Sequence, residues 1–400
     1  MSVDGADTFD VVIIGGCGHV GLPLGIALAD RGARVGLYDI NAASVKLVND
    51  ATMPFREAGA EAPLARVTAD GRLVASTDPA VIGRADIVVV VVGTPVDEYL
   101  SPDPQAIPRA IRDIGDRFAD GQLIVLRSTV YPGVTQLVER AVRELGVDVE
   151  VAFCPERIAE GRAMVELFEL PQIVAARTQS ARDRAEALFR RLTDSIVHLE
   201  PEEAELAKLF TNTWRYIKFA TANQFYMIAN NAGLDFEKIR AALSFGYPRA
   251  TDLPGPGFAA GPCLFKDTMQ LAAFNNNNFV IGHTAMLINE GLPLYLVSKL
   301  EQQFDLPKMT VGVLGMAFKG GSDDSRESLA YKLRKILMLK AADTLCTDPY
   351  INDPRFVPLD DVLTKADLLV IAAPHPEYRD LVTDKPVADM WGIAGRGMRI

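Results

Sequence analysis

Short apolar runs alternate with amphipathic stretches along the first half of the chain. This alternation predicts βαβ units and a parallel sheet that carries helices on both faces. The expected strands are Asp10–Gly15, Val35–Asp39, Asp86–Val92, Leu123–Ser128 and Val149–Phe153. We therefore expect an α/β domain in the first half.

The pattern then changes to one long helical run from Pro201 to Asn231. Pro201, followed by Glu202 and Glu203, is typical of a helix start, because acidic side chains suit the positive end of the helix dipole. The glycine at position 233 is a typical stop signal. This run predicts a single long helix.

More helix is expected through Leu300, interrupted by the Pro/Gly-rich loop at residues 253–257. The α/β pattern returns after Lys308, with a strand at Thr310–Leu314, a helix from about Glu327 to Lys340 and a strand at Leu368–Ala372. The expected domains are therefore residues 1–200 (α/β), 201–305 (helical) and 306–400 (α/β).

Composition and charge narrow the class of protein. The longest apolar run, Ile87–Val92, is too short to cross a membrane. A net charge of −11 argues against a nucleic acid partner. The four cysteines lack pair spacing, so we expect neither disulfides nor a metal site, but a reducing compartment. These features favour a cytoplasmic enzyme.

A G-x-G-x-x-G turn follows the first expected strand. Gly16 suits the tight turn, Gly18 lets a pyrophosphate approach the backbone, and Gly21 lets helix and strand pack closely. Asp39 ends the next strand, about 20 residues on, where a carboxylate would hold ribose hydroxyls and repel a 2′-phosphate. The pattern predicts a Rossmann-like domain that binds NAD rather than NADP; the alternative is a glycine turn without a ligand.

Two further patterns suggest chemistry. Lys208 and Asn212 are four residues apart and share one helix face, although a solvated lysine with an incidental asparagine is the alternative. Pro262 suits a helix start that places Cys263 in the first turn, where a thiolate is stabilised. Asp267 would share that face as a general base. The alternative for Cys263 is the buried, inert thiol that we assign to Cys17, Cys154 and Cys346.

With these residues in place, nearly the whole chain resembles the UDP-glucose/GDP-mannose dehydrogenase family. The segments that carry the resemblance occur in family order. They are Gly16–Gly21, Thr94-Pro95, Arg127–Gly133, Cys154–Gly161, Glu205–Thr213, Cys263–Asp267, Gly315–Lys319, Asp324–Ser328 and, near the end, Ala373–Tyr378, which resembles the nucleotide-base domain. The expected fold is thus α/β, with two Rossmann-like parallel-sheet domains joined by a central helical domain that contains one long helix.

The resemblance implies a role for each matching residue. Cys263 would be the nucleophile, Lys208 and Asn212 would steady the oxyanion, Asp267 would move protons, and Thr129 and Glu156 would guide water. The implied NAD contacts are Gly16, Gly18, His19, Val20, Gly21, Asp39, Thr94, Pro95, Ser128, Thr129, Lys266 and Arg326. The implied substrate contacts are Glu156, Arg157, Ile158, Ala159, Glu160, Lys208, Asn212, Arg249, Gly257, Phe258, Ala260, Cys263, Phe318 and Lys319.

The implied reaction is the NAD-dependent, four-electron oxidation of the C6 alcohol of a nucleotide sugar to a uronic acid, in polysaccharide biosynthesis. A UDP-sugar such as UDP-glucose or a UDP-N-acetylhexosamine is expected, with GDP-mannose as the alternative. The sequence is also compatible with a two-electron hydroxy-acid dehydrogenase or with a non-catalytic nucleotide-sugar sensor. The resemblance also implies a homodimer through the central helices, with Arg249 reaching the partner's substrate.

The chain departs from the family pattern beside the cysteine. Family members commonly have paired glycines there, whereas this chain has Ala260-Gly261-Pro262. A methyl group replaces a hydrogen at Ala260, and Pro262 lacks an N–H donor. Cys154 to Arg157 resembles the N-acetylhexosamine branch, but Cys263 to Asp267 resembles the glucose or mannose branch, so the sugar stays open.

Overall fold

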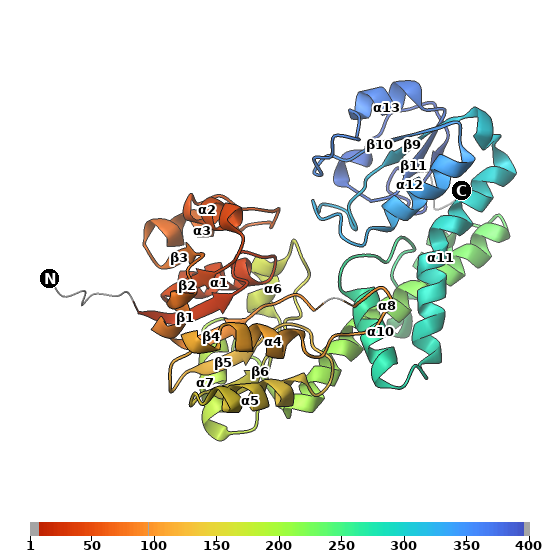
Figure 1. Cartoon of the computed structure of the whole chain (residues 1–400). Helices are drawn as coiled ribbons and strands as arrows, with labels where there is room; N and C mark the ends of the chain where they lie inside the picture. Colours follow the sequence, from red (N-terminus) through yellow and green to blue (C-terminus); the bar gives the residue numbers. More distant parts are fainter. Residues whose placement is uncertain (1–7, 95, 396–400) are drawn as a thin grey trace. The chain divides into compact units, whose positions relative to one another are not determined.

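The computed structural model describes residues 8–94 and 96–395 (Figure 1). Pro95, an expected NAD contact, lies outside the described residues. The chain divides after Phe210 into two compact units. The predicted domain limits at residues 200 and 305 stay predictions.

The first unit contains an eight-stranded sheet with the order β3-β2-β1-β4-β5-β6-β7-β8. Described neighbours in this sheet are parallel except β6 and β7, which pair antiparallel. The strands are β1 (Phe9–Ile14), β2 (Val35–Tyr38), β3 (Leu73–Ser76), β4 (Ala85–Val90), β5 (Leu123–Leu126), β6 (Glu150–Phe153), β7 (Gln172–Ala176) and β8 (Ile196–Leu199). The five predicted strands are confirmed, and the first six in this order follow the dinucleotide-binding arrangement.

Helices cover both faces of this sheet (Figure 1). Alternate residues of β1 enter different apolar clusters: Val11 and Ile13 face one cluster, and Val12 and Ile14 face the other. Helices α4 and α5 pack into the second cluster, and the others pack into the first. The helices are α1 (Gly21–Asp30), α2 (Ala42–Asn49), α3 (Glu61–Ala69), α4 (Ala106–Asp113), α5 (Val134–Leu145), α6 (Ala163–Glu169) and α7 (Gln179–Phe189).

Helix α8 (Pro201–Asn231) has the predicted limits, begins in the first unit and ends in the second. The second unit continues with α9 (Phe236–Ser244), α10 (Leu264–Phe274) and α11 (Val280–Gln303). Its sheet has the order β10-β9-β11-β12, and its described pairs are parallel. The remaining elements are β9 (Thr310–Leu314), α12 (Leu329–Lys340), β10 (Asp343–Thr347), α13 (Leu359–Lys365), β11 (Leu368–Ile371) and β12 (Val387–Ala388).

One apolar core joins the helices and the sheet of the second unit. Leu292, Leu296 and Leu300 of α11 pack in the same cluster as Val311 and Val313 of β9. Among the described helices, α11 alone is long and apolar enough by composition to cross a membrane. Only part of α11 lies in this cluster, since 39% of its apolar stretch is buried.

Helix α12 begins two residues later than predicted. Glu327 has a φ of 53°, in the left-handed region that a helix cannot contain, and the Ser328 hydroxyl accepts a hydrogen bond from the Ala330 N–H. Ser328 is therefore the N-cap. Short 3₁₀ turns complete the fold at Pro79–Arg84, Gly115–Arg117, Pro248–Ala250, Leu306–Lys308 and Pro376–Tyr378.

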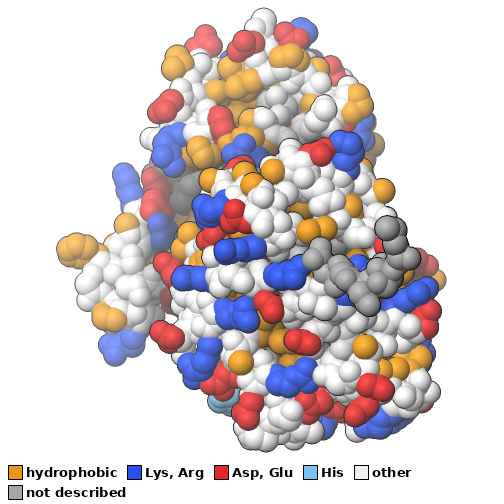
Figure 2. Space-filling view, turned by 90° about the vertical axis from the view of Figure 1, so that its left-hand side faces the viewer, with side chains coloured by type: hydrophobic (Ala, Val, Ile, Leu, Met, Phe, Trp, Pro, Cys, Tyr) orange, Lys and Arg blue, Asp and Glu red, His pale blue; other side chains and the backbone are white. Residues whose placement is uncertain are grey.

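Acidic and basic side chains alternate over the face of the first unit that Figure 2 presents. Ion pairs of the first unit include Arg66 with Asp30, Arg177 with Glu202 and Arg184 with Glu150. Mixed charge of this kind keeps a surface soluble without a strong field of one sign.

Candidate functional site

The glycine-rich turn joins β1 to α1. A Cβ atom at Gly16 would lie 2.7 Å from the Cβ of Leu37, and one at Gly21 would lie 2.5 Å from the carbonyl oxygen of Gly15, so packing excludes side chains at both. At Gly18 the nearest neighbour would be 3.6 Å away. The turn thus leaves its open side at Gly18, where a pyrophosphate needs access, and its residues fit a dinucleotide.

The carboxylate of Asp39 stabilises this turn. Its Oδ2 accepts a hydrogen bond from the N–H of Cys17 at 3.0 Å, and its Oδ1 accepts one from the N–H of Asn41 at 2.9 Å. Each carboxylate oxygen keeps a second lone pair. Asp39 therefore retains acceptors for a ribose, and its contact with the cofactor stays a prediction.

His19 lies two residues before the start of α1 and contacts two parts of the first unit. Its ring stacks on Phe55 with 4.0 Å between centroids, and its Nδ1 lies 3.9 Å from a carboxylate oxygen of Glu160. His19, a predicted cofactor contact, and Glu160, a predicted substrate contact, are thus neighbours.

The loops that follow β4 and β5 are joined at the carboxyl end of the sheet. The Ser128 hydroxyl accepts a hydrogen bond from the Val92 N–H at 2.8 Å, and the Thr94 hydroxyl donates to the Thr129 carbonyl at 2.6 Å. Ligands of open α/β sheets bind at this edge. The structure therefore brings together the predicted residues Thr94, Ser128 and Thr129.

Glu156 follows β6 and pairs with Arg127, whose side chain is fully buried. Arg127 also donates to the carbonyl of Cys154 and to Gln172, each at 3.0 Å. The other oxygen of Glu156 accepts the N–H groups of Arg157 at 2.7 Å and Ile158 at 3.0 Å. These bonds hold the segment from Glu156 to Glu160 in place. The role of Glu156 in guiding water stays a prediction.

Sequence reasoning assigned no role to Arg127 or to Glu205. Glu205 of α8 is fully buried and accepts bonds from the N–H of Gly133 at 2.6 Å and from the N–H and hydroxyl of Thr135 at 2.8 and 2.6 Å. Burial raises the pKa of Glu205 above its usual value. Glu205 thus caps α5; in the sequence it is marked only as the first residue of the segment Glu205–Thr213 that resembles the family.

Helix α8 presents Lys208 and, one turn later, Asn212. Both are buried, with 8% and 4% of their surface exposed, which argues against the alternative of a solvated lysine. Asn212 Nδ2 donates to Asp267 Oδ2 at 2.5 Å, although the two residues are 55 positions apart. Asp267 is fully buried, and its other oxygen lies 3.2 Å from the Lys266 ammonium. The hydrogen bond thus joins the predicted catalytic residue Asn212 of α8 to the predicted catalytic residue Asp267 of α10.

Cys263 is the exposed cysteine of this chain, whereas Cys17, Cys154 and Cys346 are buried. The predicted alternative of a buried thiol at position 263 is therefore wrong. Helix α10 begins at Leu264, so Cys263 is its N-cap rather than a first-turn residue as predicted. The Asp267 N–H donates to the Cys263 carbonyl at 2.9 Å, which places Asp267 one turn beyond the thiol.

The loop before Cys263 is anchored by buried amides. Asn223 accepts the N–H of Gly257 at 2.8 Å and donates to its carbonyl at 3.0 Å, and it also donates to Asn289 at 2.9 Å. Phe258 meets Trp391 edge to face, with 6.4 Å between ring centroids. The predicted substrate contacts Gly257 and Phe258 are thus held by residues that sequence reasoning missed.

Closer to the thiol, Gly261 has a φ of 100°, and a Cβ there would lie 2.6 Å from the Phe318 ring. The cysteine loop therefore rests against the turn that follows β9. A cavity of about 300 Å³ lies beside it. Its lining residues are Ala260, Gly261, Phe265, Glu290, Glu327, Ser328, Leu329, Tyr331, Lys332 and Lys335.

Three other predicted residues lie in the second unit. The Lys319 ammonium lies 5.4 Å from the ring centroid of Phe318. Arg326 forms a two-pronged ion pair with Asp324, with contacts of 2.8 and 2.6 Å. Arg249 lies on an exposed turn, where its Nε donates to the Tyr247 hydroxyl at 3.0 Å. Their contacts with ligands stay predictions.

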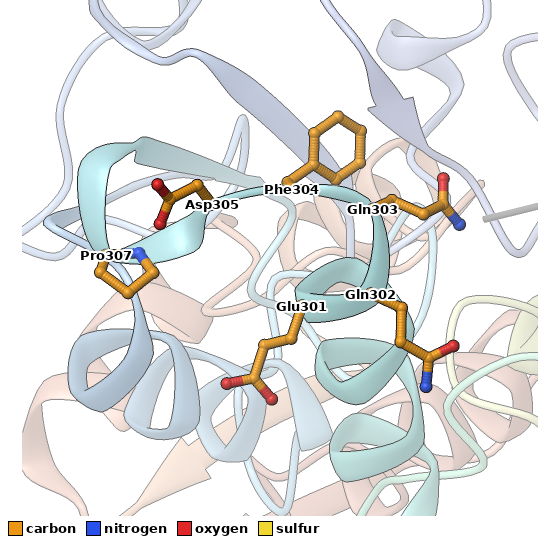
Figure 3. Close-up of a pocket in the computed structure, with 6 residues that line it drawn as sticks. All are labelled: Glu301, Gln302, Gln303, Phe304, Asp305 and Pro307. Atoms are coloured by element: carbon orange, nitrogen blue, oxygen red, sulfur yellow. The ribbon is translucent and has the colours of Figure 1, made fainter.

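A further hollow of about 420 Å³ lies where α11 ends (Figure 3). Glu301 and Gln302 extend from the last turn of α11, and Asp305 and Pro307 follow it. All four are exposed, and none was singled out from the sequence. This hollow carries no recognisable chemistry.

Comparison with known proteins shows similarity along nearly the whole chain. Three models of the UDP-glucose/GDP-mannose dehydrogenase family match: the NAD binding domain at residues 10–193, the central domain at 202–290 and the UDP binding domain at 312–396. The UDP-N-acetyl-D-mannosamine dehydrogenase of Pyrococcus horikoshii is 30% identical over 397 residues, which covers 96% of this chain and 92% of the relative.

Two solved structures are similar to this one. The UDP-D-ManNAc dehydrogenase of Pyrococcus horikoshii superimposes with a TM-score of 0.86 at 30% identity, covering 93% of this chain and 90% of that one. A UDP-glucose dehydrogenase of Pyrobaculum islandicum gives a TM-score of 0.87 at 28% identity, covering 97% and 95%. The predicted α/β class, with its parallel sheets and long central helix, is confirmed.

Proposed function

Because the chain belongs to the UDP-glucose/GDP-mannose dehydrogenase family and is an NAD-dependent oxidoreductase, we propose that it oxidises the C6 alcohol of a UDP-sugar to the carboxylate. The observation that carries the proposal is the exposed Cys263 at the start of α10, with the buried Asn212–Asp267 pair one turn further along. A two-electron hydroxy-acid dehydrogenase or a nucleotide-sugar sensor needs no such thiol.

The first oxidation draws on the polar groups of α8. Negative charge develops on the C6 oxygen as its proton leaves, and a lysine ammonium stabilises that charge strongly in a buried setting. Lys208 is buried and lies one turn from Asn212 on the same helix. Asn212 donates one of its two amide hydrogens to Asp267, and this bond fixes the orientation of the Asn212 side chain. The second amide hydrogen is left to donate to the C6 oxygen.

The second oxidation requires Cys263. An aldehyde has no alkoxide from which hydride can depart, and attack by the thiolate at C6 creates one as a thiohemiacetal. Loss of hydride from that carbon leaves a thioester, and water then releases the carboxylic acid and restores the thiol. NAD, when bound, accepts one hydride in each oxidation. The covalent bond keeps the aldehyde from escaping between the two steps.

Asp267 and Lys266 support this chemistry at the helix start. Asp267 is in contact with Asn212 and with the Lys266 ammonium, so its charge is compensated despite complete burial. We assign the movement of protons during the reaction to this carboxylate. We assign the guiding of water to Thr129 and Glu156, and the sugar contacts to the segment from Glu156 to Glu160.

The substrate proposal rests on two observations. The model of the UDP binding domain matches residues 312–396, and the compared relatives are named for UDP-N-acetyl-D-mannosamine and UDP-glucose. We assign the nucleotide to the turn that carries Phe318 and Lys319, with Phe258 and Ala260 beside the sugar. The uronic acid product would serve polysaccharide biosynthesis in the cytoplasm, a setting that suits four free cysteines.

A panel of sugar nucleotides tests the substrate class. The enzyme is mixed with NAD and each of UDP-N-acetylmannosamine, UDP-N-acetylglucosamine, UDP-glucose and GDP-mannose, and NADH is followed by its absorbance. We expect a UDP-sugar to give the highest kcat/KM. A preference for GDP-mannose would refute the assignment of uridine, and inactivity with all four would refute the enzyme proposal.

The central helices also present an apolar face that fits a second copy of the chain. Trp214, Phe225 and Ile228 of α8 are 57%, 44% and 58% exposed, and Leu287 and Leu294 of α11 are 67% and 55% exposed. Large apolar patches of this kind mark interfaces. We therefore assign this face to a homodimer, in which Arg249 would reach the partner's substrate.

Light scattering during gel filtration tests the dimer. The chain should elute with about twice the mass of 43.4 kDa, and Leu287→Glu should shift it toward the monomer, whereas Met338→Glu on the exposed side of α12 should not. A parent protein of monomer mass, or a dimer unaffected by Leu287→Glu, would contradict this interface.

A further inference from the structure

A buried aspartate–histidine pair ties together the loops at the carboxyl ends of three strands. Asp348 follows β10, His375 follows β11, and neither side chain has any exposed surface. His375 Nε2 lies 3.1 Å from Asp348 Oδ2. Both residues lie beside the turn that follows β9, which contains Phe318 and Lys319.

Asp348 fixes the first half of that turn. Its Oδ2 accepts the N–H groups of Met316 at 2.6 Å and Ala317 at 3.1 Å, and its Oδ1 accepts those of Tyr350 at 2.9 Å and Ile351 at 3.0 Å. Burial alone would raise the pKa of Asp348, but His375 and these N–H groups hold the pKa below its usual value. The carboxylate is therefore charged and fully engaged.

His375 fixes the second half. Its Nδ1 accepts a hydrogen bond from the Gly321 N–H at 3.1 Å. A ring nitrogen that accepts carries no proton, so in the neutral ring Nε2 carries it and donates to Asp348. One imidazole thus connects the Gly321 amide to the same carboxylate that holds Met316 and Ala317.

The backbone beside His375 follows the turn closely. A Cβ atom at Gly315 would lie 2.7 Å from the Cβ of Ala373, and one at Gly320 would overlap the carbonyl of Pro374. The aromatic rings of Tyr350 and Tyr378 meet the imidazole edge to face, at 5.0 and 5.7 Å between centroids. Tight packing of this kind leaves the imidazole one orientation.

Phe318 and Lys319 lie between the two anchored ends of the turn. The Phe318 N–H donates to the Asp324 carbonyl at 3.0 Å, and its ring lies against Gly261 of the cysteine loop. The conformation of residues 318–319 therefore depends on the anchors at 316–317 and 321.

We propose that Asp348 and His375 are positioning residues for the nucleoside diphosphate of the substrate, because they hold the turn 315–321 in the conformation that presents Lys319. This inference rests on the proposed function, which assigns the sugar nucleotide to that turn. Because the pair acts on the backbone of the turn and not on Cys263, Lys208 or Asn212, it sets affinity for the nucleotide rather than the rate of the chemical steps.

Three variants of the full-length enzyme test the proposal. His375→Phe keeps an aromatic ring but removes both bonds, and His375→Asn keeps an oxygen near the position of Nδ1. The matched control is Gln122→Leu, because Gln122 is buried and bonds to the carbonyls of Ile82 and Ala85 at 2.8 and 2.6 Å, at the opposite, amino end of the sheet in the first unit. UDP binding is measured by calorimetry, and KM and kcat are measured with the best UDP-sugar.

His375→Phe should weaken UDP binding and raise the KM for the UDP-sugar roughly 10- to 100-fold, because a buried N–H loses its acceptor. The kcat at saturation should stay within about twofold, since uniform binding is lost rather than stabilisation of the transition state. The KM for NAD should not change. His375→Asn should recover part of the affinity, and hydrogen exchange at the Gly321 amide should be slow in the parent protein and fast in His375→Phe.

Several results would overturn the proposal. These are equal UDP affinity in the parent protein and His375→Phe, a fall in kcat at unchanged KM, or an equal loss of affinity in Gln122→Leu. Should His375→Phe fail to fold, His375→Asn decides alone. A raised Kd for UDP in His375→Asn supports the proposal, and an unchanged Kd overturns it. If the parent protein itself binds no UDP, the assignment of a UDP-sugar fails first and the positioning role falls with it.

Discussion

Cys263 differs from the other three cysteines at the scale of single residues. It is exposed at the start of α10, whereas Cys17, Cys154 and Cys346 are buried. Burial raises the pKa of Cys17 and Cys154 to about 12 and that of Cys346 to about 11. Since the thiolate is the nucleophile, these three cysteines should react slowly, and we expect Cys263 to be the reactive thiol.

Iodoacetamide should therefore label Cys263 first. Near neutral pH we expect its rate to exceed that of each buried cysteine by about two orders of magnitude or more, because each pKa unit changes the thiolate population about tenfold. Peptide mass spectrometry over a time course measures this, with unfolded protein as the control in which all four react. Comparable labelling of Cys154 in the folded protein would contradict the assignment.

Single residues also limit what could be predicted from sequence. Asn212 and Asp267 were predicted from separate motifs, and their contact joins positions 55 residues apart, which no periodicity encodes. Arg127 and Glu205 received no role, because a buried charge is recognisable only from its partners. Asp39 was expected to face a ribose, and the structure adds that it also holds the glycine turn.

Among the elements, α8 had the predicted limits because Pro201 and the acidic first turn mark its start and Gly233 follows its end. Strands β7, β10 and β12 were not predicted. The short edge strands β3 and β8 were also missed. Each has four residues, and β8 alternates too weakly between buried and exposed positions to give a pattern. The start of α12 was misplaced because the left-handed conformation of Glu327 is set by its surroundings and not by its residue type.

The cap that Glu205 gives to α5 has a pH signature. Burial raises its pKa in the folded state, so the folded protein binds the proton more tightly than the unfolded chain does. Stability from this group therefore grows as pH falls through the folded pKa, and it is lost as pH rises. Glu205→Gln removes this dependence.

We expect the free energy of unfolding of the parent protein, relative to Glu205→Gln, to increase as pH falls from about 7 toward about 5. Urea unfolding at both pH values measures it, and Glu203→Gln, at an exposed position of the same helix, is the control. Glu205→Ala should cost roughly 2 to 4 kcal/mol near neutral pH, because two backbone N–H groups lose their acceptor. A relative stability that falls with acid would show that folding lowers the pKa of Glu205, which would contradict this account.

Gly261 lets the cysteine loop rest against the turn after β9. Gly261→Ala should lower kcat at least about tenfold, because the methyl group meets the Phe318 ring and moves the thiol by a fraction of an ångström. Gly32→Ala is the matched control: its φ of 92° imposes similar strain, but a Cβ there would meet no atom within 4 Å. Equal losses of kcat in both variants would show that backbone strain, and not contact with the Phe318 ring, causes the loss.

At the scale of the whole molecule, the family models cover the chain in the order cofactor, central and nucleotide domain. Helix α8 begins in one compact unit and ends in the other, so one helix carries both Lys208 and Asn212. Motifs spread over the whole length made the family recognisable from sequence. The sugar was not, because two of the motifs resemble different branches of the family and the chain departs from the family pattern at Ala260 and Pro262.

The ratio of NADH formed to sugar nucleotide consumed tests the central claim most directly. With limiting UDP-sugar and excess NAD, the parent enzyme should form two NADH for each sugar oxidised, and the product should be the C6 carboxylate by mass spectrometry. Cys263→Ala should lose turnover to the acid, since no thiohemiacetal can form. One NADH per sugar in the parent enzyme, or full conversion to the acid by Cys263→Ala, would contradict oxidation through a cysteine adduct.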